Sequence, residues 1–342
     1  MSTIRVLGGT GFLGSRIVTA LGRLPGARVE SASRHGAVRV DVTRKETFAA
    51  LDDSDLVIDV SDATRTPPDE LIGHCLERGI TVVETTSDSR CVERLHQRFR
   101  SANKGALVLG GGIFTGVSNL LARRAAEDVG RAERVRVAIS SSPFSGAGAG
   151  TIELMIEAMR TATITFQRGK RAESERMLPG PAVDFGAATR PTLVAPFAEA
   201  YMLHESTGAD TVDVLFSPRP AMLVPSFRWM PSWVGRTSVG RALLRGYFTV
   251  LRRWLLSGVA SGVELYARAE GAGAVRERRV FAPDGMMAAA WAVAAMAERV
   301  LEKRPNDGAC FIDDLCELDA TIARANALAG HESLRTVDTP AR

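Results

Sequence analysis

The first third of the sequence predicts a doubly wound α/β fold, and three observations support that prediction. Short apolar segments that suit buried strands alternate with segments whose apolar residues recur at helical spacing. A glycine-rich turn joins the first of these strands to the first helix. A continuous apolar segment, residues 55–60, has the composition of a strand buried on both faces of a parallel sheet. Such alternation places helices on both faces of one parallel sheet.

The elements of this region follow one another closely, and several of them end at a glycine or a proline. Strands are predicted at residues 4–7, 28–32, 38–42, 55–60, 80–84 and 106–109. Helices are predicted at residues 12–24, 45–51, 69–78 and 90–102.

The first turn carries the motif with the clearest chemistry. It contains both GxGxxG and GxxGxxG within Gly8, Gly9, Thr10, Gly11, Phe12, Leu13 and Gly14. One glycine permits the tight turn, another lets the backbone approach a pyrophosphate, and a third lets helix and strand pack closely. The helix start then offers unpaired N–H groups to phosphates. The turn therefore predicts a Rossmann dinucleotide site, the alternative being a glycine-rich turn without a ligand.

The residues after the second strand bear on which dinucleotide is bound. NAD-specific sites usually place an acidic residue about twenty residues past the loop, where it binds the ribose 2′-hydroxyl. This chain has Ser33 and Arg34 there, which can donate to a 2′-phosphate and pair with it. We therefore expect NADP(H), with Asp41 near the adenine and with Ser61 and Gly112 lining the site. A solvated arginine is the alternative for Arg34.

After about residue 125 the pattern becomes α+β. A helix is predicted at residues 151–161, and strands are predicted at residues 134–140, 163–168, 182–185, 211–216 and 262–270. An apolar helix at residues 285–302 is expected to return to the first domain. The predicted organisation is a Rossmann domain at residues 1–125, an inserted α+β substrate and dimerisation domain at 126–284, and returning C-terminal helices at 285–330.

Composition argues against several classes of protein. The 342 residues carry a net charge of +4, with no basic stripe interleaved with aromatics, so no nucleic-acid partner is expected. The four cysteines form no CxxC pair and no histidine has metal-ligand spacing, which predicts no metal site and reduced thiols in a cytoplasmic protein. No leader sequence is expected at the N-terminus, and the longest apolar run, residues 286–297, is too short to span a bilayer.

The opening motif also suits a short-chain dehydrogenase, which reduces carbonyls with a Tyr–x–x–x–Lys pair. None of the chain's three tyrosines has a lysine four residues later, so that chemistry is not expected. Over nearly its full length, the chain instead resembles the saccharopine dehydrogenase-like reductases. The matching stretches occur in the family's order: GGTGFLG, Ser33-Arg34, DLVIDVSD, GITVVETTSD, GGGIFTGVSNLLA, GAGT and DGMMAAAWAVAAMAERVL.

This resemblance implies a homodimer and a hydride passed between a nicotinamide and a C=N or C=O carbon. Three positions depart from the family pattern: Thr115 replaces a proline, Phe114 replaces a residue that is polar in some members, and Glu84 stands where Asp is frequent. These departures leave the substrate open. Imine reduction asks little of the protein beyond positioning, because an iminium already carries the charge that makes it electrophilic.

Candidates for substrate contact or proton transfer lie in two places along the chain. One group follows the sixth strand and the other lies on a predicted helix: Thr115, Ser118 and Asn119, and Tyr201, His204 and Glu205. His204 would titrate near neutral pH, the alternative being a structurally bonded histidine. Arg190 and Arg219 are candidates for holding a carboxylate.

Residues 226–256 combine three of the chain's four tryptophans with six arginines and no acidic residue. We predict that this segment closes one side of the substrate site and that the substrate is partly apolar. The alternatives are a helix packed within the second domain and contact with an anionic membrane surface. Two other functions stay open, a membrane- or lipid-associated reductase of the same fold and a non-catalytic nucleotide-binding regulator.

Overall fold

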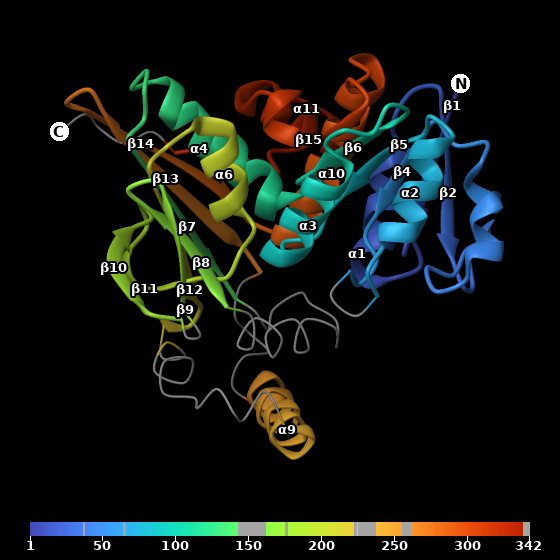
Figure 1. The fold of residues 1–342 in the computed structure, drawn as a ribbon. Helices are drawn as coiled ribbons and strands as arrows, with labels where there is room; N and C mark the ends of the chain where they lie inside the picture. Colours follow the sequence, from blue (N-terminus) through green and yellow to red (C-terminus); the bar gives the residue numbers. More distant parts are fainter. Residues whose placement is uncertain are drawn as a thin grey trace. The chain divides into compact units, whose positions relative to one another are not determined.

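The computed structural model describes residues 1–36, 38–63, 66–142, 162–174, 177–221, 224, 237–254 and 261–337, with the backbone alone at 251–254. The chain divides into two compact units (Figure 1). One consists of Met1–Leu120 with Met287–Ser333, and the other of Leu121–Met286 with Leu334–Arg342. The predicted helix at 151–161, the GAGT stretch at 148–151, and residues 226–236 and 255–256 of the predicted closing segment lie outside the described residues.

The first unit is built on a seven-stranded sheet whose neighbouring strands are all parallel. Its strand order is β15-β6-β5-β4-β1-β2-β3. The strands are β1 (Ser2–Leu7), β2 (Ala27–Ser33), β3 (Val38–Arg39), β4 (Leu56–Asp59), β5 (Thr81–Glu84), β6 (Ala106–Leu109) and β15 (Gly308–Phe311). The direction of winding reverses between β1 and β4, and open α/β sheets bind ligands at the carboxyl ends of strands beside such a reversal. The predicted Rossmann sheet is confirmed.

The helices of this unit follow its strands along the chain. They are α1 (Phe12–Leu21), α2 (Asp69–Glu77), α3 (Ser89–Phe99), α10 (Gly285–Glu302) and α11 (Leu318–Ala329), while α4 (Ser118–Glu127) continues into the second unit. Every residue of β4, β5 and β6 is buried, as expected for strands covered on both faces. The predicted helix at 45–51 is a 3-10 helix, and the predicted strand at 38–42 is paired over two residues only.

The seventh strand, β15, was not predicted. Its four residues, GACF, are too few to show a period, and only pairing with β6 defines them as a strand. Gly308 has a φ of +100°, and a Cβ there would lie 2.8 Å from the carbonyl oxygen of Arg100. The edge strand therefore depends on contacts with residues some two hundred positions earlier in the sequence.

The second unit contains a mixed sheet of order β10-β11-β12-β7-β13-β14-β16, with β8 joined to β12 and β9 to β8. The strands are β7 (Arg134–Ser141), β8 (Thr163–Gln167), β9 (Lys170–Ser174), β10 (Pro179–Asp184), β11 (Thr189–Val194), β12 (Thr211–Pro218), β13 (Val263–Gly271), β14 (Ala274–Ala282) and β16 (Arg335–Thr336). Only β7 and β12 run parallel to each other. The helices of this unit include α6 (Glu199–Thr207) and α9 (Ser238–Trp254).

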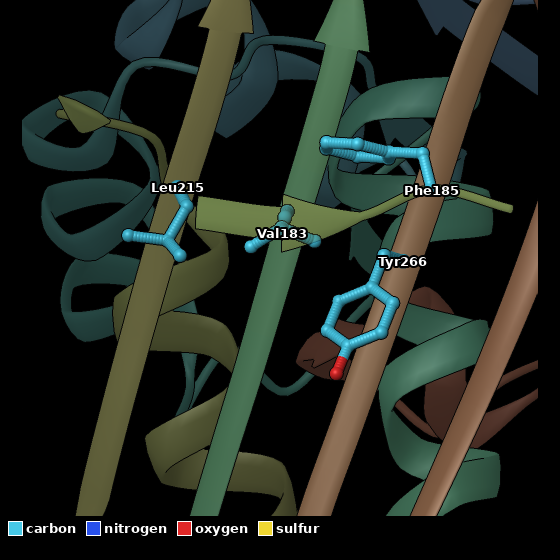
Figure 2. Packing of buried hydrophobic residues seen from close by; sticks show 5 residues of the cluster. Val183, Phe185, Leu215 and Tyr266 are labelled. Atoms are coloured by element: carbon cyan, nitrogen blue, oxygen red, sulfur yellow. The ribbon is translucent and has the colours of Figure 1, made fainter. Parts of the chain in front are cut away.

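One buried cluster covers a face of this mixed sheet. Val183 and Phe185 come from β10 and its end, and they pack on Leu215 and Tyr266 of the strands beneath, as Figure 2 shows. The rings of Phe185 and Tyr266 meet edge to face at 6.5 Å. The β10–β11 hairpin is thus held to the sheet by aromatic and aliphatic contacts.

Truncation of Phe311 tests the contribution of β15 to the first unit. This side chain is 3% exposed, and its ring centroid lies 4.5 Å from that of His96. Phe311→Ala is expected to lower the free energy of unfolding by about 3–5 kcal/mol, because it leaves a cavity in the core. Urea denaturation measures the change. The control Leu178→Ala, at a side chain 52% exposed, should shift stability by less than about 0.5 kcal/mol. Equal effects of the two substitutions would contradict the prediction.

Candidate cofactor site

The turn between β1 and α1 brings backbone atoms unusually close together. Gly8 has a φ of +78°, and a Cβ at this position would lie 3.0 Å from the carbonyl oxygen of Val60. A Cβ at Gly9 would lie 2.8 Å from the carbonyl oxygen of Val6, and one at Gly14 would overlap the carbonyl oxygen of Gly8. Glycine is therefore required at three positions of the motif by contact with β1, with the segment after β4 and with the turn itself.

The start of α1 is open to a ligand. Gly11 is the residue that precedes the helix, and it has no side chain with which to cap it. The first backbone bond of the helix runs from Ser15 N–H to the Gly11 carbonyl at 3.0 Å. The N–H groups of Phe12, Leu13 and Gly14 therefore have no intrahelical acceptor. These groups, at the positive end of the helix dipole, suit a pyrophosphate.

Arg16 lies beside this helix start and was not predicted as a site residue. Its guanidinium carbon sits 3.9 Å from the centroid of the Phe12 ring, and its Nη1 donates to the Phe12 carbonyl at 2.6 Å. The i, i+4 spacing of Phe12 and Arg16 in the first turn of α1 is the feature of the sequence that could have identified Arg16 as a site residue. The arrangement holds a cation next to the open N–H groups.

Ser33 is the last residue of β2, Arg34 follows it, and Asp41 lies just after β3. Thr10 Oγ1 donates to Ser33 Oγ at 3.1 Å, which joins the glycine turn to the end of β2. Asp41 Oδ1 accepts from the backbone N–H and hydroxyl of Thr43, at 3.0 and 2.7 Å. These bonds, with a smaller contribution from the charge of Arg34, lower the pKa of Asp41. The structure thus brings the three predicted residues to one edge of the sheet, with Arg34 exposed.

Ser61 follows β4 and lies against the glycine turn. Its backbone nitrogen would be 3.2 Å from a Cβ at Gly8, and its N–H donates to Asp59 Oδ1 at 2.8 Å. Its hydroxyl oxygen is buried, and among the described residues only the carboxyl group of Asp59 interacts with it. A polar side chain with remaining hydrogen-bonding capacity therefore borders the glycine turn.

The segment after β6 has irregular backbone and a buried amide. Gly112 has a φ of +118°, and Thr115, a buried non-glycine residue, has a φ of +59°. Thr115 Oγ1 donates to the Phe114 carbonyl at 2.6 Å. Asn119, in the first turn of α4, is fully buried, and its amide oxygen and nitrogen both lack partners in the described structure. Such a group is costly unless a ligand or water satisfies it.

The five predicted catalytic residues belong to two units. Thr115 and Asn119 lie in the first unit, and Tyr201, His204 and Glu205 lie on α6 in the second. Tyr201 is buried and Glu205 is exposed. Their catalytic roles stay a prediction.

His204 makes contacts that suit a structural role. Its ring stacks on Phe166 with centroids 3.9 Å apart, and its Nδ1 lies 3.0 Å from the Ala209 carbonyl. These contacts fix the ring between α6 and β8. The structurally bonded alternative therefore fits His204 better than a proton-transfer role does.

A buried pair of carboxyl groups lies at the carboxyl ends of β4 and β5. Asp59 ends β4, Glu84 ends β5, and the two are register partners with 0% and 1% exposure. As carboxylates, Asp59 Oδ2 and Glu84 Oε2 would have no hydrogen-bond donor among the described residues, whereas one shared proton makes each the partner of the other. Burial, and for Glu84 the charge of Asp59, raises the pKa of both groups. We assign the proton to Glu84, because the hydrogen bond between the two side chains raises the pKa of Glu84 and lowers that of Asp59.

This pair also holds the backbone segments that follow β4 and β5. Asp59 accepts from Ser61 N–H, and Glu84 Oε1 accepts from Thr86 N–H at 2.9 Å. The sequence suggested no such role, because Asp59 reads as part of an apolar strand and Glu84 as a variant family position. Only parallel pairing of β4 with β5 places the two carboxyls side by side.

Neither a metal site nor a membrane span is found in the part of the chain that the structure describes. No cluster of three or more His, Cys, Asp or Glu residues there has metal-binding geometry. Among the same residues, no helix is both long enough and apolar enough to cross a bilayer.

Comparison with known proteins gives a distant structural likeness. No family model matches the chain, and no curated protein matches its sequence. DAP dehydrogenase of C. glutamicum in complex with DAP is 14% identical, with a TM-score of 0.48 over 94% of this chain and 98% of that one. An engineered D-amino acid dehydrogenase is 14% identical, with a TM-score of 0.46 over 95% and 99%. A myo-inositol dehydrogenase from Corynebacterium glutamicum is 12% identical, with a TM-score of 0.43 over 99% and 100%. These scores are low, so we base the function on this chain's own residues.

The buried carboxyl pair predicts a pH dependence of stability. The folded chain keeps the Glu84 proton to higher pH than the unfolded chain, which releases it above a pH of about 4.3. Folding therefore takes up a proton, and this contribution to stability falls as pH rises. Relative to wild type, Glu84→Gln should gain stability between about pH 5 and 7, by up to about 1.4 kcal/mol per pH unit.

Urea denaturation of both proteins across this pH range measures the difference. Glu77→Gln, at an exposed carboxyl on α2, is the matched control for losing one acidic group. A stability difference between wild type and Glu84→Gln that stays constant with pH would show that Glu84 does not hold the proton.

Proposed function

We propose that this chain is an NADP(H)-dependent oxidoreductase of the saccharopine dehydrogenase-like type. It transfers hydride between the nicotinamide and a C=N or C=O carbon of a small, partly apolar metabolite. The observation that carries the proposal is the uncapped start of α1 beside a turn in which backbone contacts exclude every side chain at three positions. The homodimer, with contacts mainly from residues 130–280, is part of the proposal.

The preference for NADP(H) is supported by the absence of a free acidic group at the end of β2. The nearest acid, Glu30, lies within the strand and is already bonded to Arg5 at 3.3 Å and to Arg28 at 2.7 Å. A ribose 2′-hydroxyl would therefore find no carboxylate acceptor on β2. Ser33 and Arg34 instead offer a hydroxyl and a guanidinium, both donors suited to a 2′-phosphate.

The chain's own residues would bind and orient the reactants. The N–H groups at the start of α1 would hold the pyrophosphate, and the Ser61 hydroxyl and the Asn119 amide are buried groups with remaining hydrogen-bonding capacity. A bound NADPH would supply the hydride. For an iminium substrate, whose charge already favours hydride addition, orientation at the cofactor would provide most of the rate.

Cofactor affinities test this proposal. Wild type is expected to bind NADPH at least about ten-fold more tightly than NADH, since one charge-assisted pair is worth about 1.5 kcal/mol or more. Arg34→Ala should bring the ratio toward one. The matched control is Arg28→Ala, at the opposite end of β2, which should leave the ratio unchanged. Nucleotide fluorescence titration gives both constants, and equal affinities in wild type would refute the NADP preference.

A second candidate, a reductase that works at an anionic membrane surface, is favoured by α9. Four of the eight exposed large apolar side chains of the described residues lie on this helix: Val239, Leu243, Tyr247 and Val250, exposed by 70, 67, 44 and 57%. They recur every three or four residues and so share one face. The helix also carries four arginines and no acidic residue. A basic amphipathic helix with an apolar stripe suits the headgroup region of anionic lipid.

Vesicle sedimentation tests this second function. The protein is expected to pellet with vesicles containing phosphatidylserine and to stay in solution with pure phosphatidylcholine. The double variant Leu243→Glu/Val250→Glu should lose that binding, whereas Val275→Glu, at an exposed valine on β14, should keep it. Binding that survives the α9 substitutions would exclude this helix as the membrane contact.

A further inference from the structure

A polar row crosses the mixed sheet at the carboxyl ends of its parallel strands, β7 and β12. Ser217 of β12 pairs with Ser140 of β7, and Ser140 pairs with Glu264 of β13. Register partners on adjacent strands point to the same face of a sheet, so these three side chains share one face. Arg219 follows β12 directly, and its N–H donates to the Ser141 carbonyl at 2.9 Å. All of these residues belong to the second unit.

Two arginines lie near this row, and of these only Arg190 forms an ion pair among the described residues. Arg190 binds Glu264 through both edge nitrogens, Nε to Oε2 at 3.2 Å and Nη2 to Oε1 at 3.5 Å. Arg219 has its Nε and Nη2 buried without a partner among the described residues. The hydroxyls of Ser140 and Ser217, both fully buried, also lack partners there. A buried donor that makes no hydrogen bond destabilises the fold.

The charges of the cluster do not balance. Arg190 and Arg219 carry two positive charges and Glu264 carries one negative charge, so the three side chains have a net charge of +1. Burial and the neighbouring Arg190 lower the pKa of Arg219, although Glu264 acts in the opposite direction. Arg219 is partly buried, and an unpaired charge with reduced hydration destabilises a fold unless an anion meets it. One monovalent anion would balance the cluster.

The geometry of the unpaired donors indicates the kind of anion. Nε and Nη2 lie on the same edge of a guanidinium, and this edge binds the two oxygens of a carboxylate through parallel bonds. One row further down the same face, Leu215, Ala138 and Tyr266 are register partners and are covered by Val183 and Phe185 (Figure 2). The polar row therefore lies beside a filled apolar cluster, at the end of the sheet face.

We propose that Arg219, assisted by the Ser140 and Ser217 hydroxyls, binds the carboxylate of the substrate. The substrate class is then a small carboxylic acid that also carries the imine or carbonyl carbon. Arg190 acts as a positioning residue, because its bond to Glu264 holds that carboxylate away from Arg219. Naming the acid as the substrate rests on the proposed oxidoreductase function, whereas the anion site itself rests on the second unit alone.

The experiment compares matched ligands on the full-length chain by isothermal titration calorimetry. The probes are 4-methylpentanoate, its uncharged amide 4-methylpentanamide, and inorganic phosphate, each with and without NADPH. Wild type is expected to bind the carboxylate at least about ten-fold more tightly than the amide. Arg219→Gln should abolish this preference, Arg219→Lys should keep part of it, and Ser217→Ala should weaken carboxylate binding a few-fold. The control Arg276→Gln, at an exposed arginine on β14, should match wild type.

Three results would contradict the proposed site. The first is that the carboxylate shows no saturable binding, and the second is that Arg219→Gln binds the carboxylate as tightly as wild type does. The third is that phosphate binds in place of the carboxylate. A folding defect in Arg219→Gln would appear as a lower melting temperature, in which case Ser217→Ala and Arg219→Lys decide the matter. NADPH affinity is measured in every variant and should not change. A chain that binds the carboxylate through Arg219 but no nicotinamide nucleotide would keep this site and refute the proposed function.

Discussion

The β1–α1 turn depends on backbone atoms that approach more closely than a Cβ would allow. Gly8 and Gly14 contact each other's backbone, and Gly8 also faces the segment that follows β4. This contact draws the start of α1 onto the end of β1 and leaves its first N–H groups facing outward. The position of Ser61, the link from Thr10 to Ser33 and the open helix end all follow from that one turn.

Buried polar groups differ in whether the described residues satisfy them. Asp59 and Glu84 satisfy each other by sharing a proton, and they hold the turns that follow β4 and β5. Their partnership is complete within the fold, so it needs no ligand. Arg219 and Asn119 have buried polar atoms that find no partner among the described residues. Because an unmade hydrogen bond costs more than a made one gains, we propose that bound molecules complete the structure at these atoms.

The candidate site contains some residues that the sequence could identify and others whose roles only the fold distinguishes. Ser33, Arg34 and Asp41 could be chosen from sequence because a strand end about twenty residues past a glycine turn has a known place in this sheet. Arg190 and Arg219 could be chosen only as two arginines among many. Their difference in role appeared once β11, β12 and β13 were paired, since only then did Glu264 meet one of them and leave the other unpaired. For His204 the sequence left a structural role open, and only the fold showed its ring stacked on Phe166.

By itself the sequence determined the parallel sheet, the glycine turn and the closing helix, whose bounds at Gly285–Glu302 match the prediction. These features depend on local periodicity and on short motifs, which a single stretch of chain contains. The tertiary structure alone decided that GACF is the seventh strand, that Asp59 and Glu84 are partners, and that one arginine of two has no ion pair among the described residues. Each of these depends on residues distant in the sequence being brought into register, and no local pattern records that pairing.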